Sequence, residues 1–403
     1  MTDSLAHAMP LPSERSCPFD PEDGFARLRT EEPVSLLAMP GDQTGVLLTK
    51  YDDVRALLTD QRFSSKWDTM QSPVAYLPPE AKALFFGAPG MFIALDPPEH
   101  TRYRRLVTRQ FTLRRVKAME PKIRTVVTAQ LDEMEKAGPP ADLVEMFALP
   151  VPSLVIAELL GVPEEDRWEF AELTAAMMDT DRPIEETLGI RAQLLEVIGN
   201  LITMKRGEPS EDIFSWLIND ETDQLSQEEL VTIGLMLITA GQETTSGTIA
   251  LGSLILMEEP GQLALLKERP ELMDSAMDEL LRYLPVVKFG VTRVAKEDVE
   301  FAGHLIKKDQ TVVASLASAN RDAAQFENPD VLDVTRRSTG QLSFGHGVHQ
   351  CSGQHLTRLE MKVAFTELFS RFPDLRVTIP VNEVPRRETA AAYGLRHLPV
   401  AWG

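Results

Sequence analysis

Residues 344–353 read FGHGVHQCSG and carry the strongest chemical signal in this chain of 403 residues. The stretch combines three glycines and an aromatic residue with Cys351, one of only two cysteines in the chain. An amphipathic helix should follow, because apolar residues recur at helical spacing from Leu356 to Leu368. The start of a helix carries partial positive charge, which favours a thiolate over a thiol. Cys351 is therefore a candidate anionic metal ligand.

The residues of this stretch, called the cysteine loop below, suit a heme iron as the metal. An anionic sulfur in a glycine-rich turn, with Phe344 able to pack beneath it, is what an axial thiolate ligand of heme requires. Gly347 permits the turn, and Gly353 permits close approach of a flat macrocycle.

Two other interpretations of the loop stay open at this point. A zinc site is one, since His346, His349, Cys351 and His355 lie within ten residues, although the paired Cys-x-x-Cys spacing of structural zinc sites is absent. A buried, inert cysteine is the other, but it gives no reason for the glycines.

A long helix forms the second signal. Ser226 and Glu229 make a capping box before a periodic run that ends ahead of Pro260, which gives about 32 residues and about 48 Å of helix. Both ends of the run are apolar on nearly every side, which predicts burial. Between them, residues 239–248 form a polar island, TAGQETTSGT, whose glycines each cost about 1 kcal/mol in a helix interior.

The polar island offers a functional interpretation. Gly241 removes a side chain where a flat group could approach, and Thr244 can bond back to a carbonyl and open the helix locally to water. Glu243 supplies a carboxylate beside that opening. The alternative is a core helix with satisfied hydroxyl groups.

Composition excludes several classes of function. The formal charge of -20 disfavours nucleic acid as a partner. Apolar runs are too short to span a membrane, and residues 1–16 lack the features of a secretion signal. Two distant cysteines fit a reducing compartment, so we expect a soluble cytoplasmic protein. Seven bases and no acid lie between His100 and Lys117, which indicates a solvated helix face, a docking site for an acidic partner or pairing with buried carboxylates.

Periodicity over the rest of the chain predicts a mostly helical protein with a minor sheet. Helices are expected at 101–108, 121–137, 151–160, 164–179, 183–205 and 213–220. Strands are expected at 34–37 and 46–49, joined by a turn at 40–42, and at 291–294, 299–301 and 312–315.

Together these residues resemble the cytochrome P450 family, in particular soluble, ferredoxin-dependent actinobacterial hydroxylases of the Streptomyces type. Phe344, Gly347, Cys351 and Gly353 match the heme loop, residues 240–245 (AGQETT) match the central-helix motif, and residues 279–282 (ELLR) match the Glu-x-x-Arg motif. The resemblance runs from about Cys17 to Trp402. It implies a mainly α, triangular fold with a minor β region, formed by residues 1–403 as a single domain with a flexible tail at about 1–16.

The resemblance also implies roles for individual residues. Heme b would have Cys351 as its axial ligand and would contact His100, Arg104, Arg293, Phe344, His349, Gly353, Ala240 and Gly241. The catalytic residues would be Thr244, Glu243 and Gln242. A buried ion network supporting the cysteine loop would consist of Glu279, Arg282 and Arg336. Candidate substrate contacts are Met91, Ile93, Leu237, Ala240, Val287, Phe289 and Val291, with residues 183–190 as a candidate lid.

The implied activity is a monooxygenase reaction that inserts one atom of O2 into a C–H bond of a hydrophobic polyketide, macrolide, terpenoid or steroid-like compound. Electrons would come from NAD(P)H through ferredoxin reductase and ferredoxin, which would dock on the remaining bases of the Arg102–Lys117 run together with Arg358 and Lys362. A heme-thiolate enzyme that uses peroxide or couples aromatic rings is the first alternative. A heme sensor or carrier without turnover is the second.

Overall fold

The computed structural model describes residues 8–76, 78–178, 182–284, 286–388 and 390–403. The chain forms two compact units, each assembled from separate stretches of sequence. Unit 1 comprises Met1–Ala88, Phe92–Thr101 and Glu271–Cys351, and unit 2 comprises Pro89–Met91, Arg102–Pro270 and Ser352–Gly403. That residues 1–403 act as one domain stays a prediction.

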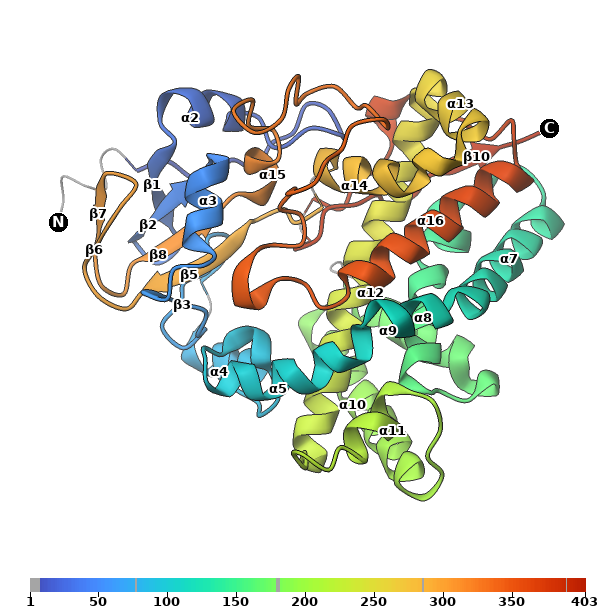
Figure 1. Ribbon diagram of the computed structural model, residues 1–403, viewed down its shortest axis with the longest axis horizontal. Coiled ribbons are helices and arrows are strands. Elements are labelled where there is room, and N and C mark those ends of the chain that lie inside the picture. The colour runs from blue at the N-terminus through green and yellow to red at the C-terminus, as the bar shows by residue number, and fades with distance from the viewer. Residues whose placement is uncertain (1–7, 77, 179–181, 285, 389) are drawn as a thin grey trace. The chain divides into compact units, whose positions relative to one another are not determined.

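A five-stranded sheet lies at the centre of unit 1, in the order β1-β2-β8-β5-β3 (Figure 1). The strands are β1 (Val34–Met39), β2 (Gln43–Leu48), β3 (Phe63–Ser64), β5 (Val291–Ala295) and β8 (Thr311–Ala314). The antiparallel β1–β2 pair confirms the expected hairpin, and its turn uses positive φ at Gly41 and Asp42. A separate hairpin pairs β6 (Val299–Phe301) with β7 (His304–Ile306).

Unit 1 also contains several helices. They are α2 (Phe25–Glu31), α3 (Tyr51–Leu57), α4 (Pro79–Phe86), α14 (Met273–Tyr283) and α15 (Leu316–Ala319), with short 3-10 helices at Phe92–Ala94, Pro270–Leu272 and Gly347–His349. The buried face of α3 presents Tyr51, Val54 and Leu57 to a core that also holds Leu48 and Val312 of the sheet. Burial of this apolar face, rather than helix propensity, stabilises so short a helix.

Unit 2 is mainly helical. Its helices are the end of α5 (Glu99–Thr108), then α6 (Leu113–Ala118), α7 (Glu120–Ala137), α8 (Pro150–Leu160), α9 (Arg167–Met177), α10 (Ile184–Gly207), α11 (Ile213–Ile218), α12 (Gln227–Glu258), α13 (Pro260–Glu268) and α16 (Gln354–Arg371). Short 3-10 or π helices lie at Arg109–Phe111, Val144–Ala148, Glu164–Asp166 and Val381–Glu383. A small sheet joins β4 (Ala141–Asp142), β10 (Pro399–Ala401) and β9 (Arg376–Val377).

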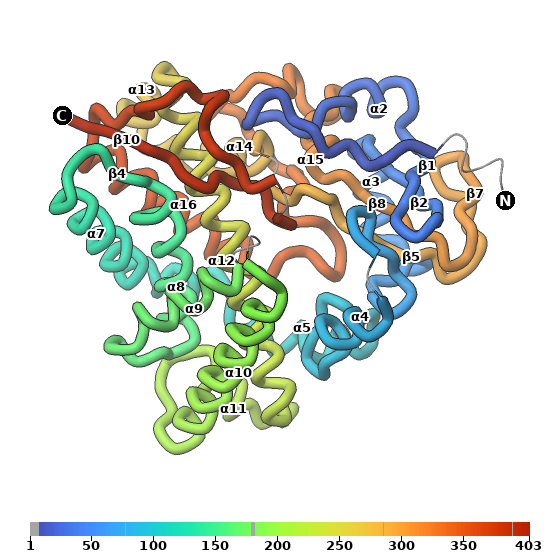
Figure 2. Tube along the Cα trace, turned by 180° about the vertical axis from the view of Figure 1, so that it is seen from behind, coloured from blue at the N-terminus to red at the C-terminus, as the bar shows by residue number. Residues whose placement is uncertain are grey.

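The central element of unit 2 is α12, which α8, α10 and α16 all contact (Figures 1 and 2). It has the predicted 32 residues and the predicted capping box: Ser226 accepts from the Glu229 N–H at 3.1 Å, and Glu229 accepts from the Ser226 N–H at 2.6 Å. Gly252 lets α16 approach closely, since an added Cβ would lie 2.5 Å from Cζ of Phe365. The helix is therefore held along its length by neighbours, not only by its cap.

Sequence periodicity located the long elements and missed short ones. All six expected helices exist, but the one expected at 164–179 divides into a 3-10 turn, Glu164–Asp166, and α9, and residue 179 lies outside the described residues. The unexpected elements include α2, α3, α4 and α6 and the two-residue strands. Within the described part of the chain no single helix is long and apolar enough to cross a membrane; α12 and α13 meet that test only together, as a pair bent by 99°.

Candidate active site

The cysteine loop is closed by backbone hydrogen bonds. The Cys351 N–H donates to the Phe344 carbonyl at 2.9 Å, and the Gly345 N–H donates to the Leu342 carbonyl at 2.7 Å. Gly347 has a φ of 75°, and a Cβ at this position would collide with the carbonyl oxygen of Leu58. Position 347 therefore requires glycine, which agrees with the turn expected there.

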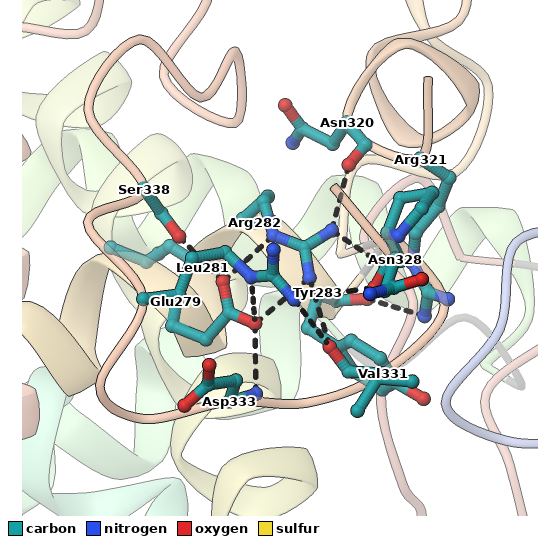
Figure 3. A network of polar contacts seen from close by, with 12 residues as sticks. Glu279, Leu281, Arg282, Tyr283, Asn320, Arg321, Asn328, Val331, Asp333 and Ser338 are labelled. Carbon is teal, nitrogen blue, oxygen red and sulfur yellow. Dashed lines mark hydrogen bonds and ion pairs between the residues drawn. The ribbon is translucent and has the colours of Figure 1, made fainter. Parts of the chain in front are cut away.

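The structure brings the three residues of the predicted ion network together in unit 1 (Figure 3); Glu279 and Arg282 are fully buried, and the Arg336 side chain is 15% exposed. Arg282 donates through Nε and Nη2 to the two carboxylate oxygens of Glu279, at 2.7 and 2.8 Å. Arg336 Nε donates to Glu279 Oε1 at 3.1 Å, and Ser338 Oγ donates to Oε2 at 2.5 Å. A buried carboxylate with this many donors is satisfied, so removal of one partner would leave charge uncompensated.

Asn320 connects this network to the cysteine loop. Its carbonyl oxygen accepts from Arg282 Nη1 at 2.9 Å, while its side-chain oxygen accepts from the Leu342 N–H at 2.7 Å. Its side-chain nitrogen donates to Ser343 Oγ at 2.8 Å, and that hydroxyl donates to the Leu281 carbonyl. The chain is thus fixed immediately before Phe344. Sequence reasoning missed Asn320, Ser338 and Ser343, because isolated polar residues carry no motif.

Three of the expected propionate contacts lie in unit 1. The rings of His100 and His349 are 4.1 Å apart between centroids, and His100 is buried. Arg293 is also buried, and that burial lowers the pKa of its guanidinium to about 10, against the opposing charge of Asp96. Within the described residues Arg293 forms no ion pair, and it donates to the carbonyl of Thr292. A buried cation without a carboxylate partner is suited to an anionic ligand.

The polar island lies where the burial of α12 is interrupted. Ala240 is exposed, and Gly241, Glu243 and Thr244 are half-buried, whereas the helix on both sides is largely enclosed. Thr244 Oγ1 donates to the Ala240 carbonyl at 2.8 Å, which is the expected back-bond, and α12 continues unbroken. A Cβ at Gly241 would lie 2.8 Å from Cδ1 of Ile156 on α8, so a larger residue at position 241 would require that side chain to shift.

Glu243 has a partner that the sequence did not suggest. Arg387 Nη2 donates to Glu243 Oε1 at 2.9 Å, and the same nitrogen donates to the Met178 carbonyl at 2.9 Å. Burial raises the pKa of Glu243, while Arg387 and the Ala392 N–H act to lower it. Gln242 is buried, and neither atom of its amide group has a hydrogen-bond partner in the described structure. A proton relay through Gln242 would therefore require water.

Part of the basic run serves the fold. Arg102 donates to Asp223 at 2.8 and 2.9 Å and to Glu229 at 2.5 Å, and Tyr103 donates to Glu229 at 2.7 Å. Burial alone would raise the pKa of Glu229, but hydrogen bonds led by that from Arg102 lower it to about 2. Arg102 therefore pairs with carboxylates of unit 2, as one of the three interpretations of the basic run proposed.

Two further bases of the run also have partners within unit 2. Arg109 pairs with Asp220 at 3.0 Å, and the Arg115 guanidinium lies 4.0 Å from the ring centre of Trp216. Arg109 is nevertheless exposed, as are Arg105, Arg114 and Lys117, whereas Arg104 and Arg115 are half-buried. The surface available to a partner is smaller than the sequence indicated.

The seven candidate substrate residues come from both units and differ in environment. Met91 is buried and Ile93 is exposed. Val287 and Val291 contact the apolar core of unit 1, as ordinary core residues do. Leu237 and Phe289 are half-buried.

The described residues contain no group of three or more His, Cys, Asp or Glu side chains that could hold a metal ion, so the zinc alternative has no site there.

Comparison with known proteins decides the family. The chain is 44% identical over 384 residues to cytochrome P450 105C1 of a Streptomyces species, covering 95% of this chain and 96% of that protein. This chain belongs to the cytochrome P450 family. The family profile itself, described as cytochrome P450, matches residues 203–391.

Other cytochrome P450 proteins extend the likeness to the whole chain. Vitamin D3 dihydroxylase of Streptomyces griseolus is 38% identical over 404 residues, which cover all of this chain and 98% of that protein. The structure of a mutant of the P450 MycG in complex with mycinamicin IV superimposes with a TM-score of 0.91 at 36% identity, covering 98% of this chain and 100% of the other. The expected mainly α P450 fold with small sheets is therefore confirmed.

Membership of the cytochrome P450 family establishes the type of enzyme and its cofactor. The protein is a P450 monooxygenase, and its cofactor is heme with a cysteine thiolate ligand. The side chains of each unit, taken separately, are suited to binding a heme. Unit 1 offers the closed cysteine loop and the buried Arg293, and unit 2 offers the uncovered centre of α12.

Proposed function

We propose that Cys351 is the axial thiolate ligand and that the enzyme hydroxylates C–H bonds of a hydrophobic small molecule. The observation that carries the proposal is the cysteine loop itself, closed between Cys351 and Phe344 and tied through Asn320 to the buried network of Glu279. A rigid loop keeps the sulfur at one position, which an axial ligand needs. The start of α16 at Gln354 favours the thiolate form.

The other proposed heme contacts are of two kinds: cationic residues for the propionates, and residues that would lie against the macrocycle. The two propionates would be neutralised by Arg293, His100, His349 and Arg104. Of these, Arg293 gives the strongest argument, because it is a buried cation whose pKa is lowered by burial. Phe344 and Gly353 would contact the macrocycle on the side of the sulfur, and Ala240 and Gly241 on the other side. When bound, the heme supplies the oxidising chemistry, which inserts one atom of O2 into substrate and reduces the other to water.

Protons would pass along α12. The hydroxyl of Thr244 would hold a water molecule at the uncovered part of the helix, and Glu243 would exchange a proton between solvent and that hydroxyl. Positioned acid catalysis of this kind contributes about 10² to 10⁴ in rate. Gln242 would orient water, since its buried amide group has both donors and acceptors to offer.

The substrate would be apolar and of moderate to large size, as for a polyketide, macrolide, terpenoid or steroid-like molecule. Relatives whose names or complexes include vitamin D3 and mycinamicin IV support this class. The contacts would come from Met91, Ile93, Leu237, Ala240, Val287, Phe289 and Val291. Residues 183–190, which include the start of α10, stay the candidate lid.

Electrons would come from NAD(P)H through a ferredoxin reductase and an acidic ferredoxin. Arg105, Arg114 and Lys117 are exposed bases of the run and would dock the ferredoxin, together with Arg358 and Lys362 of α16. Replacement of Arg114 by Glu should weaken ferredoxin-driven reduction and flatten its dependence on salt, because exposed charges act mainly on association.

The decisive experiment is spectroscopic. The reduced protein with carbon monoxide should show the absorption band from which the family takes its name. Cys351→His should abolish the band, while Cys17→Ser, which replaces the only other cysteine, should retain it. Persistence of the band in Cys351→His would overturn the ligand assignment.

A further inference from the structure

The segment that joins α11 to α12 is acidic and contacts the basic run within unit 2. Residues 219–223 read NDETD, so three of these five side chains are carboxylates. The segment is anchored on both sides, since the Asn219 side chain donates to the Ser215 carbonyl at 2.7 Å and Leu225 is buried. We call residues 219–223 the acidic loop. Its carboxylates offer the basic run the same charge that an acidic protein would bring.

Arg102 is the base that the acidic loop holds firmly. Its Nε and Nη2 donate to the two oxygens of Asp223 at 2.8 and 2.9 Å, and its Nη1 donates to Glu229 of α12 at 2.5 Å. The Glu229 side chain is only 12% exposed, so its charge depends on this partner. Separation of Arg102 from its carboxylates would leave charge uncompensated in a largely buried place. Arg102 therefore stays with unit 2 when another protein binds.

Arg109 is held by the same loop much more weakly. Its Nη1 donates to Asp220 Oδ2 at 3.0 Å and, at 3.5 Å, to the Thr222 hydroxyl. The Arg109 side chain is 47% exposed, so water and salt screen its attraction to Asp220. Exposed ion pairs of this kind contribute little to folding stability. A carboxylate of another protein can therefore replace Asp220 at Arg109 at little cost to the fold.

The loop itself fixes Asp220 in position. Asp220 Oδ1 accepts from the Thr222 N–H at 2.8 Å and from the Thr222 hydroxyl. These hydrogen bonds, and to a smaller extent the charge of Arg109, lower the pKa of Asp220. The loop thus keeps its shape and its negative charge when Asp220 is separated from Arg109. The neighbouring Glu221 is exposed and forms no ion pair within the described structure, so it carries the same charge without covering a base.

We propose that the acidic loop is an autoinhibitory contact: Asp220 occupies Arg109 in the free enzyme, and an acidic ferredoxin displaces it on docking. This assignment rests on the ferredoxin docking proposed above and adds Arg109 to the bases that bind the ferredoxin. Because the loop competes with the carboxylates of the ferredoxin, it lowers the affinity and disfavours proteins that carry fewer acidic groups. Lower affinity arises mainly from faster dissociation, which favours exchange of a spent ferredoxin for a reduced one.

The test measures the Kd of the heme-loaded enzyme for a plant-type [2Fe–2S] ferredoxin with an acidic surface, at low and at high salt. Asp220→Asn keeps the side-chain oxygen that accepts from Thr222 but loses the charge that holds Arg109. It should bind the ferredoxin about two- to fivefold more tightly at low salt. Glu221→Gln is the matched control, since it removes one negative charge without freeing a base, and it should have a smaller effect. Both effects should fade at high salt, where exposed charges are screened.

A second background separates release of Arg109 from a simple loss of charge. In Arg109→Gln, the change Asp220→Asn should tighten binding no more than Glu221→Gln does, because no base remains to be freed. Equal effects of the two changes in the parent enzyme would overturn the autoinhibitory contact, as would an Asp220→Asn effect that persists undiminished in Arg109→Gln.

Arg114→Glu distinguishes this outcome from failure of the docking surface itself. If Arg114→Glu binds the ferredoxin as tightly as the parent, the docking surface is refuted and the autoinhibitory contact with it. If Arg114→Glu weakens binding while Asp220→Asn and Glu221→Gln remain equal, the docking surface stands and only the autoinhibitory contact is refuted.

Discussion

Glu360 on α16 has a carboxyl group enclosed by protein on every side, and its Oε2 atom has no hydrogen-bond partner among the described residues. Burial raises the pKa of Glu360 well above its ordinary value. A glutamate in the unfolded chain releases its proton at a pH of about 4.3. Above that pH the unfolded chain loses the proton and the folded chain keeps it, so Glu360 makes the protein less stable as pH rises.

We expect Glu360→Gln to flatten this dependence. Its melting temperature should match that of the parent near pH 4 and exceed it increasingly toward pH 8, because the amide carries no proton to lose. Glu367→Gln on the same helix is the control, since that side chain is more exposed and pairs with Arg124. An equal slope of melting temperature against pH in Glu360→Gln and the parent would refute the assignment.

Asn320 is the residue through which the ion network reaches the cysteine loop. Asn320→Ala leaves the Leu342 N–H and the Ser343 hydroxyl without their partner, which should cost about 1–3 kcal/mol. Because the lost hydrogen bonds hold the chain directly before Phe344, we expect this variant to release heme faster than the parent. The rate of heme release is measured by its transfer to excess apomyoglobin. Gln325→Ala, at an exposed neighbouring position, should release heme at the parent rate. Equal rates in the two variants would show that Asn320 does not support the loop.

At the scale of elements, α12 depends on glycine where α16 crosses it. Gly252→Ala places a Cβ 2.5 Å from the ring of Phe365, so the variant should lose about 1–3 kcal/mol in a denaturant titration. Gly199→Ala on α10, where an added Cβ meets nothing within 4 Å, should gain up to about 1 kcal/mol. Recovery of stability in the double variant Gly252→Ala, Phe365→Leu would locate the cost in this contact. A destabilised Gly199→Ala would contradict the packing argument.

The long elements could be predicted because each contains its own signal. The capping box and apolar period of α12 lie within one stretch, and the β1–β2 hairpin carries its own turn. The short helix α3 and the strands of two residues depend on partners distant in sequence, so local pattern does not reveal them. Glu279 and Arg282 were found through the resemblance to a family motif, whereas Asn320 and Arg387 belong to no motif and were missed. Their partners, Leu342 and Glu243, become neighbours only in the folded chain.

On the scale of the whole molecule, neither unit is a continuous segment. Residues 102–270 contain α12 but lack α16, which contacts α7 and α12 and begins only at Gln354. We therefore expect a fragment of residues 102–270 to show no cooperative thermal transition by circular dichroism, because the apolar side of α12 that α16 covers would face water. Addition of a peptide spanning residues 352–403 should restore some cooperative structure. A sharp transition in the fragment alone would refute this dependence.

The late position of α16 bears on synthesis in the cell. Because α16 begins at Gln354, well after α12 ends at Glu258, the nascent protein exposes the uncovered side of α12 until α16 has also emerged from the ribosome. Chaperones that hold apolar segments would find their target during that interval. Under the proposed assignment of Cys351 as the ligand, the loop that would hold the heme is also made after α12, so α12 has to wait for both the cofactor and its covering helix.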